Sequence, residues 1–373
     1  MVERYLGELT PKLGFGFMRL PQKDNSTFDM NLIKNMVDVF LAEGFSYFDT
    51  AYLYPGSEDA IREALVERYP RKNFTIANKL PVISVQKAED AYTFFETSLN
   101  RTGAEYFDFY LLHSLSATSS EKVEKFGLWE FGRRLKEKGL IKHFGFSFHG
   151  SPDLLENVLT QHPEVEFVQL QINYLDWDDE KVQARRCYEI ARANGTPITI
   201  MEPVKGGLLA GTASALDIFN SADSTASIAS WAMRFAASLD GLITILSGMN
   251  NLEQLYDNIN TIRNFKPLTE GEYAVIEKVV NTFRSIPRIP CTACRYCVED
   301  CPQKINIPIL LDLYSDYMVY QSATAGKDMY PVFTTNTNRG KASDCIGCRI
   351  CEERCPQGIG IVDIMKKIAE VFG

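Results

Sequence analysis

The 373-residue sequence contains no hydrophobic run of the roughly 18 residues that a membrane helix needs, so no membrane-spanning segment is expected. It also lacks an excess of positive charge. There are 39 Lys and Arg against 48 Asp and Glu, and this net charge of −9 argues against a protein that binds nucleic acid. Residues 1–5 include charges where a signal peptide would need an apolar run. We therefore expect a cytoplasmic protein that contacts neither membrane nor nucleic acid.

Cysteine is almost absent from the first 290 residues, where Cys187 stands alone, whereas the other eight cysteines fall between Cys291 and Cys355. A secreted disulfide scaffold would spread its cysteines through a small chain. The abrupt change instead marks a domain boundary, and we predict one domain over residues 1–285 and another over residues 286–373. Cys187 lies in a helix-like stretch and is expected to be a buried structural thiol.

The first domain alternates short β-branched or aromatic runs with amphipathic stretches, about eight times between residues 10 and 265. This alternation favours a (β/α)8 barrel, the TIM-barrel architecture. An open doubly wound sheet is the alternative, but Gly14-Phe15-Gly16 does not lead into a helix as its glycine-rich turn would. The expected strands cover residues 13–19, 47–51, 74–79, 107–113, 143–148, 167–174, 198–202 and 242–247, and the expected helices cover residues 31–43, 57–68, 88–101, 128–138, 180–194, 227–238, 252–262 and 270–284.

Polar residues stand at the carboxyl ends of the expected strands, where a barrel of this kind carries its chemistry. A single polar residue there is as often a loop cap as a functional group, whereas six at equivalent ends indicate an active site. In chain order these residues are Asp49, Lys79, His113, Ser147, Gln171 and Glu202.

Short motifs accompany these strand ends in a fixed order. The run from Phe48 to Tyr54, Phe-Asp-Thr-Ala-Tyr-Leu-Tyr, is followed by Gly56-Ser57-Glu58. Further motifs are Asn78-Lys79, Leu111-Leu112-His113, Gly145-Phe146-Ser147, Gln171-Ile172-Asn173-Tyr174, Glu202-Pro203 and Leu255-Tyr256-Asp257-Asn258-Ile259. In this order and spacing, residues 10–265 resemble the aldo-keto reductase family.

The resemblance implies the family's catalytic tetrad, Asp49, Tyr54, Lys79 and His113, and hydride exchange between a nicotinamide and a small carbonyl or alcohol substrate. A free tyrosine has a pKa near 10, and Lys79 beside Tyr54 would lower that pKa by stabilising the phenolate. Asp49 would hold Lys79 charged, and His113 would donate a hydrogen bond to the carbonyl oxygen. Tyr52 is a rival proton donor by composition, but strand alternation should point it elsewhere.

The resemblance also implies contacts to a bound NADP or NAD. Ser147 and Gln171 fall where the family hydrogen-bonds the nicotinamide carboxamide, and Met201 falls where it stacks an aromatic ring on the nicotinamide. Gln254 and Asn258 complete the expected nucleotide contacts. Because Gln254 stands where a basic residue commonly helps to grip the extra phosphate of NADP, the choice between NADPH and NADH stays open.

The second domain contains an internal repeat of cysteine spacing, C-x2-C-x2-C-x3-C-P, which begins at Cys291 and again at Cys345. This spacing is similar to that of bacterial two-cluster ferredoxins, in which each run gives three thiolates to one 4Fe–4S cluster and its fourth to the other. Zinc is the alternative, but zinc sites usually pair two C-x2-C units and need neither the third cysteine nor the Cys-Pro end. We assign Cys291, Cys294, Cys297 and Cys355 to one cluster, and Cys301, Cys345, Cys348 and Cys351 to the second.

These features predict an α/β protein, in which a TIM barrel of aldo-keto reductase type is followed by a small α+β ferredoxin-like domain with two 4Fe–4S clusters. The expected function is an oxidoreductase that couples carbonyl or alcohol chemistry to electron transfer, with a redox partner protein. A flavin would join hydride chemistry to single-electron clusters; no flavin motif is visible, although barrels bind flavin without a short signature. The alternative is an electron-transfer protein whose barrel is a docking scaffold with little carbonyl reductase activity.

Overall fold

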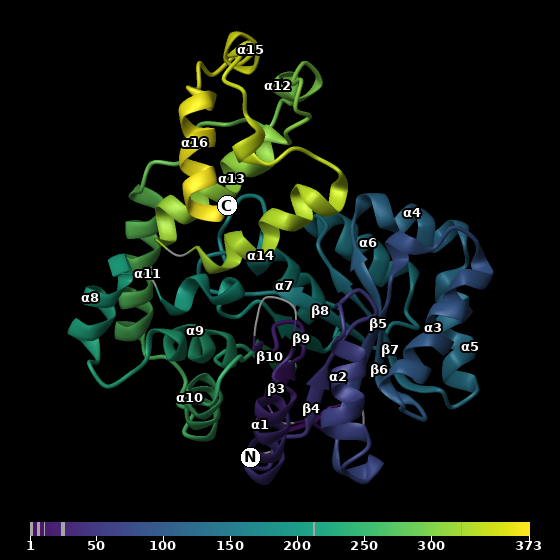
Figure 1. Cartoon of the computed structure of the whole chain (residues 1–373). Coiled ribbons are helices and arrows are strands. Elements are labelled where there is room, and N and C mark those ends of the chain that lie inside the picture. The colour runs from purple at the N-terminus through teal and green to yellow at the C-terminus, as the bar shows by residue number, and fades with distance from the viewer. Residues whose placement is uncertain (1–2, 6–7, 11, 24–26, 212, 322) are drawn as a thin grey trace. The chain divides into compact units, whose positions relative to one another are not determined.

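The computed structural model describes residues 3–5, 8–10, 12–23, 27–211, 213–321 and 323–373 (Figure 1). The chain divides into two compact units, one formed by residues 1–204 and 230–268 and the other by residues 205–229 and 269–373. Among the described helices, none combines the length and the apolar composition needed to cross a membrane.

Eight parallel strands of the first unit close into a barrel in the order β10-β3-β4-β5-β6-β7-β8-β9. The strands are short apolar runs that are almost wholly buried, as expected of a parallel sheet covered on its outer face by helices. The eight predicted strands are found in the predicted places, although β3 ends at Gly16 and not at Arg19, β4 at Asp49 and not at Ala51, and β8 at Gln171 and not at Tyr174. Their bounds are β3 (Leu13–Gly16), β4 (Tyr47–Asp49), β5 (Thr75–Leu80), β6 (Phe107–Leu115), β7 (Ile141–Phe148), β8 (Phe167–Gln171), β9 (Ile198–Met201) and β10 (Leu242–Gly248).

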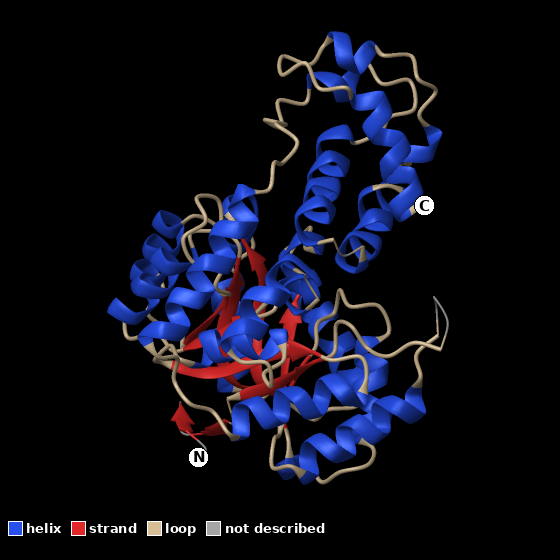
Figure 2. Ribbon diagram, turned by 90° about the vertical axis from the view of Figure 1, so that its left-hand side faces the viewer, coloured by secondary structure: helices blue, strands red, loops and turns tan. Residues whose placement is uncertain are grey.

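Helices surround this barrel, with the strands at the centre of the unit (Figure 2). They are amphipathic: α5 buries Leu128, Phe131 and Leu135 and exposes Arg133 and Arg134. The helices are α1 (Met30–Ala42), α2 (Ser57–Ile61) with its π-helical continuation η1 (Arg62–Val66), α3 (Ala88–Thr102), α4 (Ala117–Lys125), α5 (Leu128–Glu137), α6 (Pro152–Gln161), α7 (Ala184–Ala193), α9 (Ile228–Ala237) and α10 (Leu252–Arg263). The same unit contains two short 3-10 turns, η2 (Arg71–Asn73) and η3 (Val82–Ser84). The strands β1 (Glu3–Tyr5) and β2 (Glu8–Thr10) form a separate antiparallel pair.

The barrel interior explains where the polar strand ends point. Tyr47, Ala77 and Phe109 belong to a buried interior cluster. Because side chains alternate along a strand, the residues two positions after Tyr47 and Ala77 face the same interior, nearer the carboxyl end. Those residues are Asp49 and Lys79, so the strand geometry itself brings the acid and the amine together.

The second unit joins two separate stretches of the chain. From the first stretch come η4 (Lys205–Ala210) and α8 (Ala213–Ala222). In this unit α8 contacts α11, and η4 contacts α14. The remaining elements are α11 (Glu270–Ser285), α12 (Tyr296–Glu299), α13 (Ile307–Tyr320), α14 (Thr324–Phe333), η5 (Thr335–Thr337), η6 (Ala342–Asp344), α15 (Ile350–Glu353) and α16 (Ile361–Phe372).

In the described part of residues 269–373, the regular secondary structure of the predicted ferredoxin-like domain is helical. The strands that an α+β domain would contain are not seen in these described residues. The isoleucines that follow each cysteine run explain how it forms a core without strands. Ile305, Ile307, Ile359 and Ile361 are buried together with Met365 in one apolar cluster. Loops and helices supply this core, and the cysteines line its edge.

Candidate active site and cluster sites

The centre of the candidate active site is a buried ion pair between β4 and β5. Lys79 Nζ lies 2.6 and 2.7 Å from the two carboxylate oxygens of Asp49 and also donates to the Thr50 carbonyl at 2.8 Å. Lys79 is fully buried and Asp49 is 4 % exposed. Burial raises the pKa of Asp49. Burial alone would lower the pKa of Lys79, but its interactions with Asp49 and Tyr54 outweigh burial and raise that pKa. Lys79 is thus a fixed ammonium group.

Two aromatic rings lie beside this ion pair. Lys79 Nζ is 5.1 Å from the ring centre of Tyr54, and the rings of Tyr54 and His113 meet edge to face with their centres 5.7 Å apart. Burial, aided by the charge of Lys79, lowers the pKa of His113 to about 3, so its imidazole is neutral at pH 7. The structure therefore brings the four residues of the predicted tetrad into one cluster.

The acidity of Tyr54 differs from the expectation. The charge of Lys79 does act to lower the pKa of the phenol, but burial is the larger effect and leaves that pKa raised. The predicted lowering of this pKa by Lys79 is therefore present, but desolvation of the phenolate outweighs the one nearby ammonium. The phenol keeps its proton at neutral pH, as a proton donor must.

The loop that carries Tyr54 is held by the residues that follow it. Ser57 Oγ donates to the Phe17 carbonyl at 2.9 Å and lies 2.6 Å from Thr50 Oγ1. Gly56 has φ +70°, and a side chain there would lie 2.9 Å from the Phe28 ring. The Gly56-Ser57-Glu58 motif thus fixes the loop conformation, and the loop in turn positions Tyr54.

Tyr52 lies in a different environment. Its ring centre is 5.0 Å from that of Phe94, and the Arg101 guanidinium lies 4.6 Å from the ring centre. These contacts hold the ring among side chains outside the tetrad. The geometry therefore favours Tyr54 over Tyr52 as the proton donor.

The predicted carboxamide contacts are only partly available to a ligand. Ser147 is buried, and its Oγ accepts the Ser114 N–H at 2.8 Å, which leaves the hydroxyl proton to donate. The amide nitrogen of Gln171 already donates to Asp176 at 2.8 Å. Met201 is partly exposed at the end of β9.

The other two predicted nucleotide residues also have partners inside the protein. Gln254 Oε1 accepts the Asn250 N–H at 2.9 Å, and Asn258 Nδ2 donates to Ser247 Oγ at 2.9 Å. Asn258 is 5 % exposed, so this buried hydrogen bond joins α10 to the end of β10.

Gln169 is a candidate site residue that sequence reasoning missed. It is 3 % exposed, its Nε2 lies 3.4 Å from Met201 Sδ, and its buried Oε1 has no hydrogen-bond partner among the described residues. A buried amide oxygen without a donor is costly, so this atom fits the amide N–H of a nicotinamide. Alternation along β8 could have found it, since it shares an interior face with Gln171 and Phe167.

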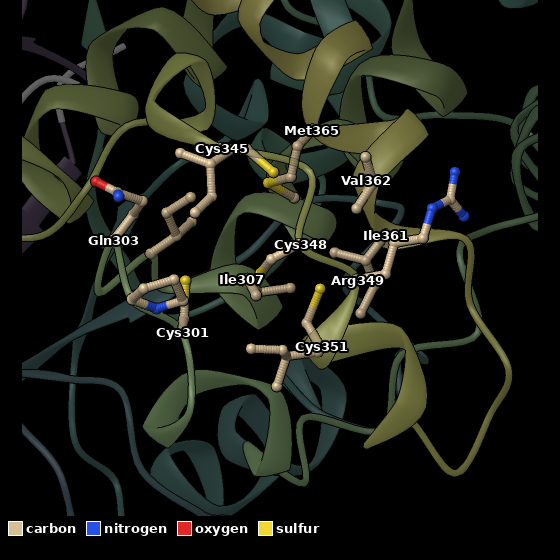
Figure 3. Close-up of a pocket in the computed structure, with 14 residues that line it drawn as sticks. Cys301, Gln303, Ile307, Cys345, Cys348, Arg349, Cys351, Ile361, Val362 and Met365 are labelled. Carbon is tan, nitrogen blue, oxygen red and sulfur yellow. The ribbon is translucent and has the colours of Figure 1, made fainter.

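The eight clustered cysteines lie in two groups of four. Each group takes three cysteines from one run and the fourth from the other, which is the grouping that the sequence predicts. Cys301, Cys345, Cys348 and Cys351 line one pocket (Figure 3), and Cys291, Cys294, Cys297 and Cys355 line another.

Both pockets fit a 4Fe–4S cluster in their donor sets and in their apolar walls, to which Ile305 and Ile359 contribute. Burial raises the pKa of Cys297 to about 11 and that of Cys351 to about 12, so iron binding must displace thiol protons. Cys187 belongs to neither group. It is 5 % exposed, and burial raises the pKa of its thiol to about 11.

Comparison with curated proteins gives relatives of moderate similarity. The aldo-keto reductase str7 of Strobilurus tenacellus is 28 % identical over 234 residues, which cover 59 % of this chain and 66 % of that protein. An aldo-keto reductase of Mycolicibacterium paratuberculosis is 31 % identical over 160 residues, covering 42 % of this chain and 51 % of that protein. The matches thus span about half to two thirds of these relatives.

Solved structures share the fold at lower identity. An aldo-keto reductase from Bacillus halodurans in its holo form superposes with a TM-score of 0.60 at 22 % identity, covering 74 % of this chain and 96 % of that one. An aldo-keto reductase from Klebsiella pneumoniae in complex with NADPH gives 0.59 at 17 % identity, covering 75 % and 94 %.

Family models account for both parts of the sequence. Residues 12–281 match the model of the aldo/keto reductase family, and residues 290–360 match that of a 4Fe-4S dicluster domain. The first match covers most of the chain. The protein therefore belongs to the aldo/keto reductase family and carries a 4Fe-4S dicluster domain after the family region.

Proposed function

We propose that the protein interconverts a small carbonyl compound and its alcohol at the barrel mouth, with a bound NADP or NAD. The observation that carries this proposal is the buried Lys79–Asp49 ion pair with Tyr54 and His113 beside it. The NADPH complex of a reductase with the same fold supports the nicotinamide. The unpaired Oε1 of Gln169 and the hydroxyl of Ser147 are the groups that would hold its carboxamide.

Each member of the tetrad has a separate role in this reaction. When bound, the nicotinamide supplies or accepts the hydride. Tyr54 gives its proton to the developing alkoxide, and Lys79 stabilises the phenolate that remains. His113, neutral at pH 7, donates a hydrogen bond to the carbonyl oxygen through its N–H. Asp49 keeps Lys79 charged and in place.

We further propose that the two cysteine groups hold 4Fe–4S clusters that carry electrons between this chemistry and a redox partner protein. A hydride carries two electrons and a proton, and each cluster accepts one electron. Two clusters would therefore take up both electrons of one hydride while the proton is released, and a bound flavin would divide the electron pair. In this proposal residues 1–285 perform the carbonyl chemistry and residues 286–373 the electron transfer.

The test compares two variants of anaerobically reconstituted full-length protein, Tyr54→Phe and Cys348→Ser. Turnover is driven in one assay by NAD(P)H and in another by a reduced dye, and flavin content is measured on the same samples. In a coupled enzyme, dye-driven carbonyl reduction fails in both variants. Tyr52→Phe is the matched control and should retain turnover.

Two other outcomes would reject parts of the proposal. If NAD(P)H-driven reduction survives in Cys348→Ser at the full rate, the barrel is an independent reductase. If no carbonyl compound is reduced and dye-linked electron transfer survives in Tyr54→Phe, the barrel is a docking scaffold for an electron-transfer protein.

A further inference from the structure

The first unit contains a cavity of about 220 Å³ at the carboxyl ends of β7 and β8. Its apolar lining includes Phe148, Leu170 and the buried Cys187. Its polar lining includes His149 and Lys181. The cavity is thus large enough for a small molecule that has both an apolar body and a polar end.

The positive charge of this cavity comes from an exposed lysine, Lys181. Among its lining residues Lys181 is the one whose side chain is charged at neutral pH, since burial lowers the pKa of His149 and raises that of Cys187 to about 11. Within the described residues, no acidic side chain pairs with the Lys181 ammonium. The nearby carboxylate of Asp179 instead accepts the backbone N–H groups of Lys181 and Val182, both at 2.9 Å.

The cavity adjoins the tetrad through His149. Phe148 pairs with Leu170 across β7 and β8, and His149 follows Phe148, two residues after Ser147. His149 is close enough to His113 to help lower the pKa of that ring. Glu202 is an acidic group whose charge acts to raise the pKa of His149, and its carboxylate is already paired with Arg19 at 3.5 Å.

We propose that this cavity binds the end of the substrate remote from its carbonyl group, and that this end carries a carboxylate held by Lys181. The substrate class is then a small oxo acid, or the corresponding hydroxy acid, with an apolar segment between its two functional groups. Phe148 and Leu170 pack against that segment, and neutral His149 offers a hydrogen-bonding nitrogen to the carboxylate. This inference rests on the carbonyl chemistry proposed above.

The test uses two aldehydes that differ in one charge, 4-carboxybenzaldehyde and its methyl ester. The kcat/KM of the unaltered protein should favour the acid about tenfold, as expected for one charge-assisted contact. Lys181→Gln should abolish this preference and leave the ester unaffected. The matched control, Lys72→Gln, removes an exposed lysine elsewhere on the same unit and should change neither value.

A binding measurement separates this inference from the proposed reaction. Benzoate should bind to the nucleotide-free protein, about tenfold more weakly to Lys181→Gln, and equally well to Tyr54→Phe. If benzoate binds in this way but neither aldehyde is reduced, the carbonyl chemistry is wrong and the anion site stands. If the ester is reduced as well as the acid and benzoate does not bind, the anion site is wrong.

A second, independent observation concerns the two cysteine pockets, which differ although their sequences repeat. The pocket in Figure 3 includes Ile346 and Met365 in its lining. The position equivalent to Ile346 in the other pocket is Thr292, whereas the equivalent glutamines, Gln303 and Gln357, line one pocket each. The pocket of Cys291, Cys294, Cys297 and Cys355 is therefore the more polar of the two.

The arginines at these pockets add a difference in charge. Arg295 and Arg349 occupy equivalent positions in the two runs, and each lines its own pocket. Arg349 pairs with Glu352 at 2.9 Å, whereas Arg295 has no acidic partner among the described residues. Arg354, which also lines the Cys291 pocket, is neutralised by Asp300 at 3.1 Å.

We infer that the cluster held by Cys291, Cys294, Cys297 and Cys355 has the higher reduction potential of the two. Accepting an electron makes a cluster more negative, and a nearby unpaired positive charge and polar walls stabilise that state. An apolar pocket with a neutralised arginine disfavours it. The first electron to enter the domain therefore resides on the Cys291 side.

Redox titration of the reconstituted protein with dithionite, monitored by EPR, tests this order. Two reduction steps are expected. Arg295→Gln should lower the potential of the upper step, and Arg349→Gln, the matched control, should shift the lower step by less. Cys294→Ser and Cys348→Ser assign each step to its pocket. The inference is wrong if both clusters are reduced at one potential or if Arg295→Gln moves the lower step.

Discussion

The Asn78 side chain donates a hydrogen bond at 2.9 Å to the Glu58 carboxylate, which is 2 % exposed, while its own carbonyl oxygen accepts the Lys79 backbone N–H at 2.7 Å. Glu58 lies in the first turn of α2, four residues after Tyr54. One amide therefore joins the loop that carries Tyr54 to the strand that carries Lys79.

This tie predicts the effect of Glu58→Gln. We expect the free energy of unfolding to fall by about 1.5–3 kcal/mol, because a buried charged acceptor is lost, and the kcat for carbonyl reduction to fall with it. Urea unfolding and steady-state kinetics measure the two effects. The control is Glu63→Gln, which breaks a surface pair with Lys34 and should cost less than about 1 kcal/mol. Equal losses in the two variants would contradict the buried role of Glu58.

Lys79→Met should be strongly destabilising as well as inactive. It leaves the Asp49 carboxylate buried without its cation, and breaking a buried pair in this way costs about 3–5 kcal/mol. Adding Asp49→Asn should recover part of this loss, since the uncompensated charge is then gone. Urea denaturation at pH 8 measures both variants, and a double variant less stable than Lys79→Met would refute the explanation.

The pKa of His113, about 3 in the folded protein against 6.5 when free, sets a pH dependence. The unfolded chain binds this proton first, so stability is retained above pH 6.5 and lost as the pH falls from 6.5 towards 3. Between pH 7 and pH 5 this loss amounts to at most about 2 kcal/mol.

His113→Gln should therefore make the unfolding free energy less dependent on pH in this range, with His149 contributing in the same direction. Urea unfolding at pH 5, 6 and 7 gives the slopes. Parallel curves for the two proteins would show that the folded protein does not exclude the proton from His113.

Gln169→Leu should weaken NADP(H) binding about tenfold, because the nicotinamide amide loses its buried acceptor. Gln171→Leu, two residues later on the same face, should have little effect on the nucleotide, since Gln171 donates to Asp176 instead. Calorimetric titration with NADPH compares the two. If Gln171→Leu weakens NADPH binding more than Gln169→Leu does, the carboxamide contact is made by Gln171, as the sequence first indicated.

The ligand groups predict about eight irons and eight acid-labile sulfides per chain after anaerobic reconstitution. Cys301→Ala should remove the EPR signal of the cluster that Cys345, Cys348 and Cys351 hold and leave the other signal. Cys187→Ala should leave the iron content unchanged, because Cys187 belongs to neither pocket. Stoichiometric zinc without charge-transfer absorption would exclude the clusters.

The sequence predicts the parts of this molecule that depend on local periodicity and spacing. The strand ends that carry Asp49 and Lys79 follow from short apolar runs, and the two cysteine groups follow from a spacing that permits few arrangements. Periodicity does not predict helix α4, because Ala117–Lys125 is mostly polar and Val123 is its one buried residue.

Other features depend on burial and on neighbours distant in sequence, which periodicity does not reveal. The raised pKa of Tyr54 results from desolvation in the folded site. The choice between Gln169 and Gln171 depends on two contacts: the amide nitrogen of Gln171 donates to Asp176, whereas the buried amide oxygen of Gln169 has no partner among the described residues. The cavity near Lys181 forms only when the segment after β8 folds back beside the end of β7.

The second unit is assembled from residues 205–229 and 269–373, and this division has a consequence for synthesis on the ribosome. Helix α8 emerges long before α11, the helix that it contacts in the finished protein. Phe219 of α8 is fully buried in the folded chain. In the nascent chain it therefore stays uncovered by α11 until that helix has been translated. A ribosome that stops after residue 268 would release a protein with all its barrel strands but an uncovered apolar helix, which is the kind of product that chaperones and proteases select.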